Sequence, residues 1–94
     1  MVKFPPGRIV MTRGISDRVE VEPEFSEFIQ VSLFRHLNGD WGDLGKHDKE
    51  ANEIALVDGE RLMSSYLHEK LRTKVWVFTE ADRTSTTVMF PHEY

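Results

Sequence analysis

The segment Val75–Tyr94 constrains the fold of this chain more than any other stretch. Val75–Phe78 is an apolar run of strand-forming residues, and Thr84–Phe90 is a second run rich in Thr, Val and Phe. The polar residues Glu80–Arg83 lie between the two runs and favour a turn. The pattern therefore predicts a β-hairpin.

The strand pairing of this hairpin follows from a tight turn at its tip. Such a turn places Trp76 opposite Met89 and Val77 opposite Val88, and these cross-strand pairs would hold the two strands together. Both faces of the first strand are apolar, which indicates a strand inside a sheet and not at its edge.

A short strand and a long helix are expected near the N-terminus. Arg8–Thr12 is predicted to be a strand, and Asp17–Val21 a polar connection. The helix begins at Glu22-Pro23, because proline loses no hydrogen bond at the first helical position, and it ends at Asn38-Gly39. Its core-facing residues are expected to be Phe25, Phe28, Ile29, Leu33 and Leu37.

A second helix is expected from Lys46 or His47 to Val57, and Asp58-Gly59 ends it. The run Leu62–Leu67 is too short for its periodicity to separate helix from strand, and we favour a strand. The inward residues of the helix are expected to be Ala51, Ile54, Ala55 and Leu56. The strand would carry Leu62, Ser64 and Tyr66 on one face and Met63 and Leu67 on the other.

Together these elements predict a single α+β domain over residues 1–94. The order β-α-α-β-β-β places two helices on one face of an antiparallel sheet. A chain of 94 residues with 39% hydrophobic and 30% charged residues is typical of a globular domain with one modest core. The residues expected to be buried together are Phe25, Phe28, Ile29, Leu33, Ile54, Val75, Val77 and Val88.

The composition restricts the partners and the cellular location. The net charge of −4 disfavours a protein whose main task is binding nucleic acid, because phosphate binding needs clustered Lys and Arg. The absence of cysteine excludes disulfides and thiolate metal sites and suits a reducing compartment. No apolar run has the length of a membrane span or of a signal peptide core. We therefore expect a cytoplasmic protein that binds another protein, with no membrane partner and with a homodimer left open.

Four residues with metal-ligand chemistry lie close together in the sequence: Asp40, Asp43, His47 and Asp48. Their oxygen atoms suit a hard cation, but their spacing matches no metal-binding loop. We expect Asp40 to close a turn and Asp43 to cap the next helix, with no metal. Trp41 lies between two glycines and is either a stacking platform or, as we favour, a plug at the end of the core whose N–H binds a carbonyl.

A group of polar residues, the polar ring, is expected around the hairpin tip. Its members should lie within reach of one another, because adjacent elements usually pair in space. The group is either a network that fixes the hairpin or a recognition site in which Arg–carboxylate pairs supply specificity. It comprises Thr79, Glu80, Asp82, Arg83 and Thr86 from the hairpin, and Arg61 and Tyr66 from the preceding strand.

Two other groupings are weighed against the polar ring. Arg35, Arg61 and Tyr66 would converge on a phosphate, unless Arg61 pairs with Glu80 or Asp82 across neighbouring strands. The four histidines, His36, His47, His68 and His92, show no paired spacing and are interpreted as unrelated surface or helix-end residues. No nucleophile elbow, phosphate loop or dinucleotide fingerprint is present, so the sequence favours a protein that is not an enzyme and predicts no cofactor.

Three segments carry a resemblance to a known family: Arg35–Leu44, Asp48–Tyr66 and Val75–Tyr94. The chain resembles a family of small bacterial proteins that are usually called plasmid-related or hypothetical, some of which are labelled subunits of type I restriction enzymes. The resemblance implies a setting in mobile elements or the accessory genome, and it implies no activity. The matching residues are Gly39 to Asp43, Asn52, Ala55-Leu56, Arg61, Ser64, Tyr66, Trp76, Thr79 to Arg83, Thr86-Thr87, Pro91, Glu93 and Tyr94.

Two classes of function follow from these observations. The first is a macromolecule-binding or regulatory module, such as an anti-defence factor carried on mobile DNA. The second is a ribonuclease toxin, because the predicted order β-α-α-β-β-β is similar to that of the RelE/ParE toxin superfamily. A positive groove beside Arg35, Arg61 and Arg83 would favour the toxin, and the acidic net charge favours the binding module.

Overall fold

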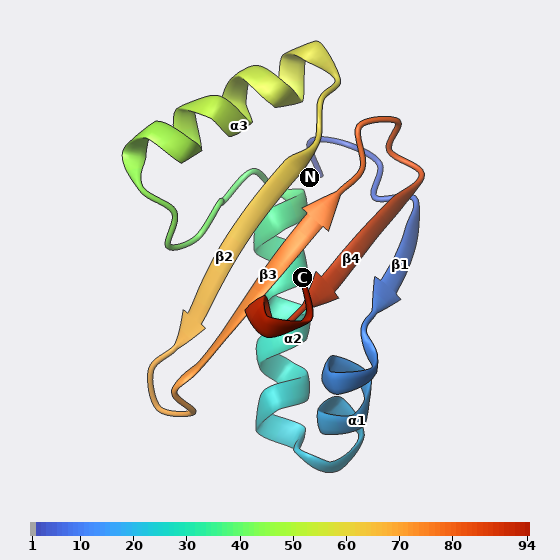
Figure 1. Cartoon of the computed structure of the whole chain (residues 1–94), viewed down its shortest axis with the longest axis vertical. Helices are drawn as coiled ribbons and strands as arrows, with labels where there is room; N and C mark the ends of the chain where they lie inside the picture. The colour runs from blue at the N-terminus through green and yellow to red at the C-terminus, as the bar shows by residue number, and fades with distance from the viewer. Residues whose placement is uncertain (1) are drawn as a thin grey trace.

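A four-stranded sheet with helices on one side forms the centre of the molecule (Figure 1). The computed structural model describes residues 2–94. The predicted α+β class is confirmed, although three helices are present where the sequence predicted two. The elements are β1 (Arg8–Met11), α1 (Arg13–Val21), α2 (Pro23–Leu37), α3 (Lys46–Asp58), β2 (Leu62–His68), β3 (Thr73–Thr79), β4 (Ser85–Met89) and the 3₁₀ turn η1 (Pro91–Glu93).

The strands lie in the order β1-β4-β3-β2, and the sheet is mixed. β2, β3 and β4 pair antiparallel as expected, but β1 runs parallel to β4. The predicted hairpin register is confirmed, since Trp76 pairs with Met89 and Val77 with Val88. β3 lies between two other strands, which agrees with its apolar character on both faces. The run that could have been helix or strand is strand β2.

The expectation of a polar connection before the long helix was wrong, because Arg13–Val21 forms helix α1. The sequence there is polar, but Ile15 is fully buried in the main core. The Glu93 carboxylate accepts a hydrogen bond of 3.0 Å from the backbone N–H of Gly14 in the first turn of α1. A carboxylate at this end of a helix stabilises it through the helix dipole. The helix is therefore supported by residues far away in the sequence.

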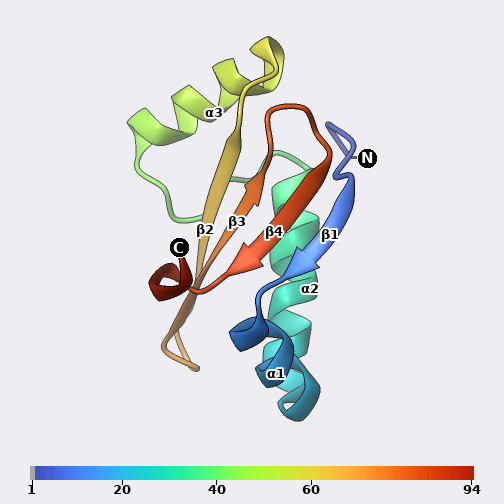
Figure 2. The same ribbon diagram turned by 45° about the vertical axis from the view of Figure 1, so that its right-hand side comes forward.

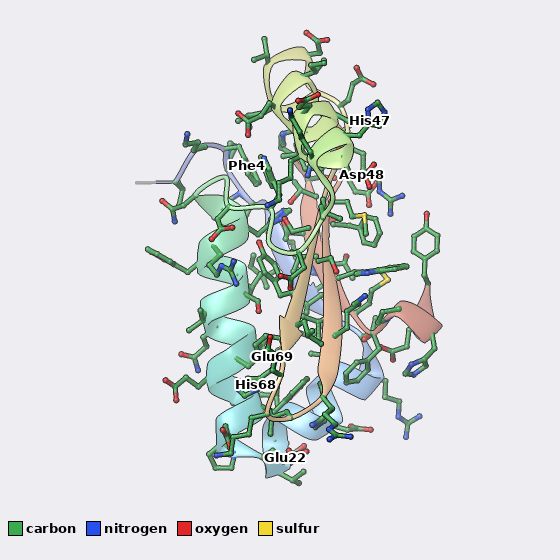
Figure 3. The ribbon with its side chains drawn as sticks, turned by 90° about the vertical axis from the view of Figure 1, so that its left-hand side faces the viewer. Phe4, Glu22, His47, Asp48, His68 and Glu69 are labelled. Carbon is green, nitrogen blue, oxygen red and sulfur yellow. The ribbon has the colours of Figure 1, made fainter. Side chains whose placement is uncertain are left out.

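Helices α1 and α2 cover one face of the sheet, as the edge-on view in Figure 3 shows for α2. The main core lies between them and the sheet and contains Phe25, Ile29, Val75, Val77 and Val88 as predicted, together with Ile15 and Tyr66. Phe28 and Leu33 pack against this core and are only partly buried. None of the helices within residues 2–94 is long and apolar enough to cross a membrane.

Helix α3 lies beside the end of β2 and not over the sheet, as Figures 1 and 2 show. The predicted inward positions of Ile54 and Ala51 were therefore wrong, since Ile54 is 60% exposed and Ala51 is exposed. Ala55 does face inward, as expected. It belongs to a second, smaller core cluster of Phe4, Trp41, Ala55 and Leu62.

No helix among residues 2–94 covers the second face of the sheet, and only η1 and the C-terminal residue lie over it (Figure 1). We call this the open face. Its members follow from strand pairing, because residues that pair directly point to the same side of a sheet. They are Arg8 and Val10 of β1, Met63, Ser65 and Leu67 of β2, Lys74, Trp76 and Phe78 of β3, and Ser85, Thr87 and Met89 of β4.

Candidate functional site

The loop between α2 and α3 is held by an ion pair at its start. Arg35 donates hydrogen bonds of 2.7 and 3.2 Å to the Asp40 carboxylate, and these bonds lower the pKa of Asp40. Asp40 also accepts the backbone N–H of Gly42 at 3.1 Å, so it closes a turn as predicted. The hydroxyl of Tyr66 donates to the Asp40 carbonyl at 2.6 Å and joins this loop to the sheet.

Trp41 is a plug of the second core cluster, as the sequence analysis favoured. It is 3% exposed, which leaves no face for stacking on a ligand. Its indole N–H donates a 2.6 Å hydrogen bond to the carboxylate of Glu53 on α3, where a carbonyl acceptor was expected. Trp41 therefore joins the loop to α3.

The same loop closes the outer edge of β2. The Asp43 amide donates to the Ser65 carbonyl, and the Asp43 carboxylate accepts the Leu67 amide, both at 2.7 Å. Asn52 of α3 binds both backbone groups of Met63, at 2.5 and 3.3 Å. The prediction that Asp43 caps α3 was wrong, because its carboxylate pairs with the sheet edge. Protected edges of this kind prevent pairing with other chains.

No metal-binding group of three or more His, Asp or Glu side chains is present within residues 2–94. Asp40 and Asp43 bind the protein groups described above. His47 and Asp48 are exposed on α3 (Figure 3). The four residues are thus used separately.

The structure divides the polar ring between the two faces of the sheet. Tyr66 and Thr86 are fully buried on the helix side, and burial raises the pKa of Tyr66 above its usual value. Thr86 bonds to Thr79 at 2.8 Å and to the Pro6 carbonyl at 2.8 Å. Neither Tyr66 nor Thr86 can meet a macromolecule at the surface in this fold.

A buried histidine, His36, completes this internal network, so the prediction that it is a surface or helix-end residue unrelated to any site was wrong. His36 is fully buried and bonds to Ser64 through Nδ1 at 2.5 Å and to Thr79 through Nε2 at 2.9 Å. Burial, with a smaller contribution from the charge of Arg83, lowers the pKa of His36 to about 4. The spacing of Phe25, Ile29, Ser32 and His36 along one side of α2 could have revealed it.

Arg83 and Asp82 hold the hairpin tip. Arg83 has a positive φ of 61° and donates to the Glu60 carbonyl at 2.6 Å and to the Ala55 carbonyl at 3.2 Å. These carbonyls lie at the C-terminal end of α3, where a cation is favourable. Asp82 accepts the amide and hydroxyl of Thr84 at 3.1 and 2.6 Å, and the hydroxyl bond lowers its pKa.

The open face carries a cluster that sequence reasoning did not assemble. The Arg61 guanidinium lies 4.2 Å from the centre of the Phe78 ring and donates a 3.1 Å hydrogen bond to the Tyr94 hydroxyl. Tyr94 stacks on Phe78 at 5.2 Å, and Trp76 meets both rings edge to face. Arg61 also lies 3.8 Å from Glu80, one of the ion pairs considered from the sequence. We call Arg61, Trp76, Phe78 and Tyr94 the aromatic cluster.

The charges of the molecule are distributed unevenly. None of the strand residues on the open face is acidic, and Arg8 and Lys74 there are basic and exposed. Helices α2 and α3 carry more acidic residues than Lys or Arg, and the acidic ones are Glu24 and Glu27 on α2 and Asp48, Glu50, Glu53 and Asp58 on α3. Helix α1 carries two residues of each sign.

The open face is therefore the candidate functional site: an apolar and aromatic centre bordered by basic residues and by the Glu80 carboxylate beside Arg61. Comparison of the chain with protein-family models, with curated proteins and with solved structures finds no match in any of the three.

Proposed function

We propose that this chain is a protein-binding module and that the open face of its sheet is the binding surface. The aromatic cluster is the observation that carries this proposal. Trp76 and Met89 remain partly exposed, and Tyr94 is 70% exposed, on a sheet face that no helix covers among the described residues. Contiguous apolar surface of this kind marks interaction sites.

The composition of the open face favours a protein partner. Trp, Tyr, Met and Arg are enriched at protein interfaces and supply most residues whose truncation weakens binding strongly. The open face contains Trp76, Met63 and Met89, next to Arg61 and Tyr94. Arg8 and Lys74 on this face pair with no carboxylate among residues 2–94, and they favour a partner surface with acidic groups around an apolar centre.

Two observations weigh against a ribonuclease. Arg35 lies over the ring of Tyr66 on the helix side, and Arg61 lies over Phe78 on the open face. These two arginines therefore face opposite sides of the sheet and do not line one groove. Arg83 binds carbonyl groups at the end of α3. The resemblance to plasmid-related proteins supports a regulatory role in an accessory genome, where the partner is a protein of the host or of a competing element.

The test places a photo-crosslinking amino acid at one position of the intact chain in living cells. Thr87 lies on the open face between the positions of Val10 and Phe78, and Phe34 is the matched control on α2, at 67% exposure. We expect a discrete crosslinked product from position 87 and none from position 34. Its loss in Trp76→Ala, with circular dichroism unchanged, would locate the contact.

The opposite results would contradict the proposal. Equal crosslinking from position 34, or a product from position 87 that persists in Trp76→Ala, would show that the open face is not the binding surface. An RNA in the crosslinked product would favour the ribonuclease class instead.

A further inference from the structure

The two edge strands of the sheet, β2 and β1, differ in whether other segments hydrogen-bond to their outer backbone groups. The loop after α2 and Asn52 of α3 bind the outer backbone groups of β2. At the other edge, Arg8 and Thr12 donate their amides inward, to Thr84 at 3.0 Å and to Val88 at 3.1 Å. Backbone groups point alternately to the two sides along a strand, so Arg8, Val10 and Thr12 direct their N–H and C=O groups toward β4. The N–H and C=O groups of the two alternate residues point outward.

Those two residues are Ile9 and Met11, and no hydrogen bond within residues 2–94 uses their outward groups. Figures 1 and 2 show no element beyond β1. The side chains of Ile9 and Met11 are apolar and 43% and 40% exposed. Natural edge strands are protected from pairing by short length, charged residues or proline. β1 has only four residues and begins with Arg8, but its other three residues, Ile9–Met11, are all apolar.

We propose that two copies of the chain pair through β1, antiparallel and edge to edge, so that their two sheets become one continuous sheet. The geometry allows one register that uses all four outward groups of each strand. Ile9 then lies opposite Met11 of the second copy, and Val10 lies opposite its own counterpart on the two-fold axis. Gly7, with a φ of +65°, and helix α1 end the pairing on either side.

The charges agree with this register. Arg8 is exposed, and no carboxylate among the described residues lies within 4.0 Å of it. In the proposed pairing Arg8 lies opposite Thr12 of the second copy, whose hydroxyl donates a 2.6 Å hydrogen bond to Glu93. Each guanidinium therefore comes beside a carboxylate of the other copy. The two Arg8 side chains are about 13 Å apart along the strand and do not repel each other closely.

The size of the interface sets the strength of the dimer. A strand of four residues buries less than the roughly 1,000 Å² of a stable interface, so we expect a weak dimer that forms at about 100 µM or above. Dimer formation would also place the two open faces side by side. The side chain of Val10 is part of the open face, and in the proposed register the two Val10 residues lie opposite each other on the same side of the joined sheet. This surface is independent of the proposed protein partner, which needs only one open face.

The first experiment uses single-cysteine variants, since the natural chain has no cysteine. Opposed residues such as the two Val10 have Cα atoms about 4.5 Å apart, which a disulfide can span. We expect Val10→Cys to form a covalent dimer under mild oxidation at least tenfold faster than Arg8→Cys, whose copies lie too far apart. Arg8→Cys is the matched control, because it lies on the same strand and the same face.

The second experiment measures mass by sedimentation velocity from about 10 µM to 1 mM, the range of a small or transient interface. The wild type should shift from monomer to dimer, and Met11→Lys should remain monomeric. Leu67→Lys, which places the same charge at the closed edge, should behave as the wild type. Equal crosslinking of the two cysteine variants, a wild-type monomer at 1 mM, or dimers of Met11→Lys would overturn the proposal. None of these results would affect binding through the open face.

Discussion

Gly42 lies against Ser65 with no room for a side chain, because a Cβ atom on Gly42 would be 2.0 Å from the Ser65 carbonyl oxygen. The same atom would be 2.6 Å from the Tyr66 ring, and the φ of Gly42 is +74°. This contact lets the loop after α2 lie on the edge of β2. We expect Gly42→Ala to lower the free energy of unfolding by about 2–4 kcal/mol, measured by urea denaturation.

Gly59→Ala is the control for this prediction. Gly59 has the same φ of +74°, but a Cβ atom there would meet nothing within 4 Å. The control therefore reports only the backbone cost of a left-handed residue, about 1 kcal/mol. Equal losses in the two variants would show that close approach to Ser65 contributes nothing.

The buried His36 makes stability depend on pH. In the unfolded chain His36 takes up a proton near its ordinary pKa of 6.5. In the folded chain burial lowers the pKa of His36 to about 4. The unfolded state therefore binds more protons between these values. Stability should be complete above about pH 6.5 and fall by up to ~3 kcal/mol as the pH decreases toward 4.

Urea titrations at several pH values between 4 and 7.5 would measure this dependence. His36→Gln removes the titrating group and keeps a polar side chain beside Ser64 and Thr79. Its slope of stability against pH should be clearly smaller than that of the wild type. Identical slopes would mean that His36 is not the group responsible.

The Arg83 side chain should stabilise the folded protein. Its guanidinium binds carbonyl groups at the end of α3. Removing it takes away the side-chain donor to the Glu60 carbonyl and one of several donors to the Ala55 carbonyl. We expect Arg83→Ala to cost about 1–3 kcal/mol in a denaturant titration. Arg72→Ala is the control, since Arg72 also has a positive φ, of 51°, and its exposed side chain makes no hydrogen bond within residues 2–94. A loss below about 0.5 kcal/mol for Arg83→Ala would be the value expected of an exposed position and would contradict the capping role.

Among the phenylalanines of α2, Phe25 should contribute most to stability. Phe25 is fully buried, so Phe25→Ala should cost about 3–5 kcal/mol. Phe28 is only partly buried and should cost less than Phe25 when truncated. Phe34→Ala, at 67% exposure, should change stability by less than about 0.5 kcal/mol. Thermal or urea unfolding of the three variants would establish this order, and a large loss at Phe34 would contradict the assignment of the inner side of α2.

The parts of the fold that sequence patterns predicted depend on neighbours in the chain. The hairpin register follows from a short turn between two apolar runs, and the bounds of α2 follow from Pro23 and Asn38-Gly39. Helix α1 was missed because its support comes from elsewhere: Ile15 enters a core made by other elements, and Glu93 binds the first turn of α1. Nothing in the local sequence reports those contacts.

In the candidate site, too, local sequence patterns predict some features, and contacts between distant segments determine the others. Strand alternation could assign Trp76 and Phe78 to one face, but it could not show which face the helices leave open. Tyr94 joins the cluster because η1 turns the chain back over the sheet, and Arg61 reaches the cluster from the start of β2. Tyr66 and Thr86 were grouped with these residues because their strands are adjacent, yet they point to the opposite face.

The position of β4 between β1 and β3 has a consequence for synthesis on the ribosome. Within residues 2–94, β4 is the last strand along the sequence, and it is the strand that joins β1 to the rest of the sheet. At ordinary rates of translation, roughly 4–15 s separate the appearance of β1 from that of its partner. During this interval the apolar side of α2 has no complete sheet to pack against. The nascent chain is thus exposed to chaperones and proteases until β4 has left the exit tunnel.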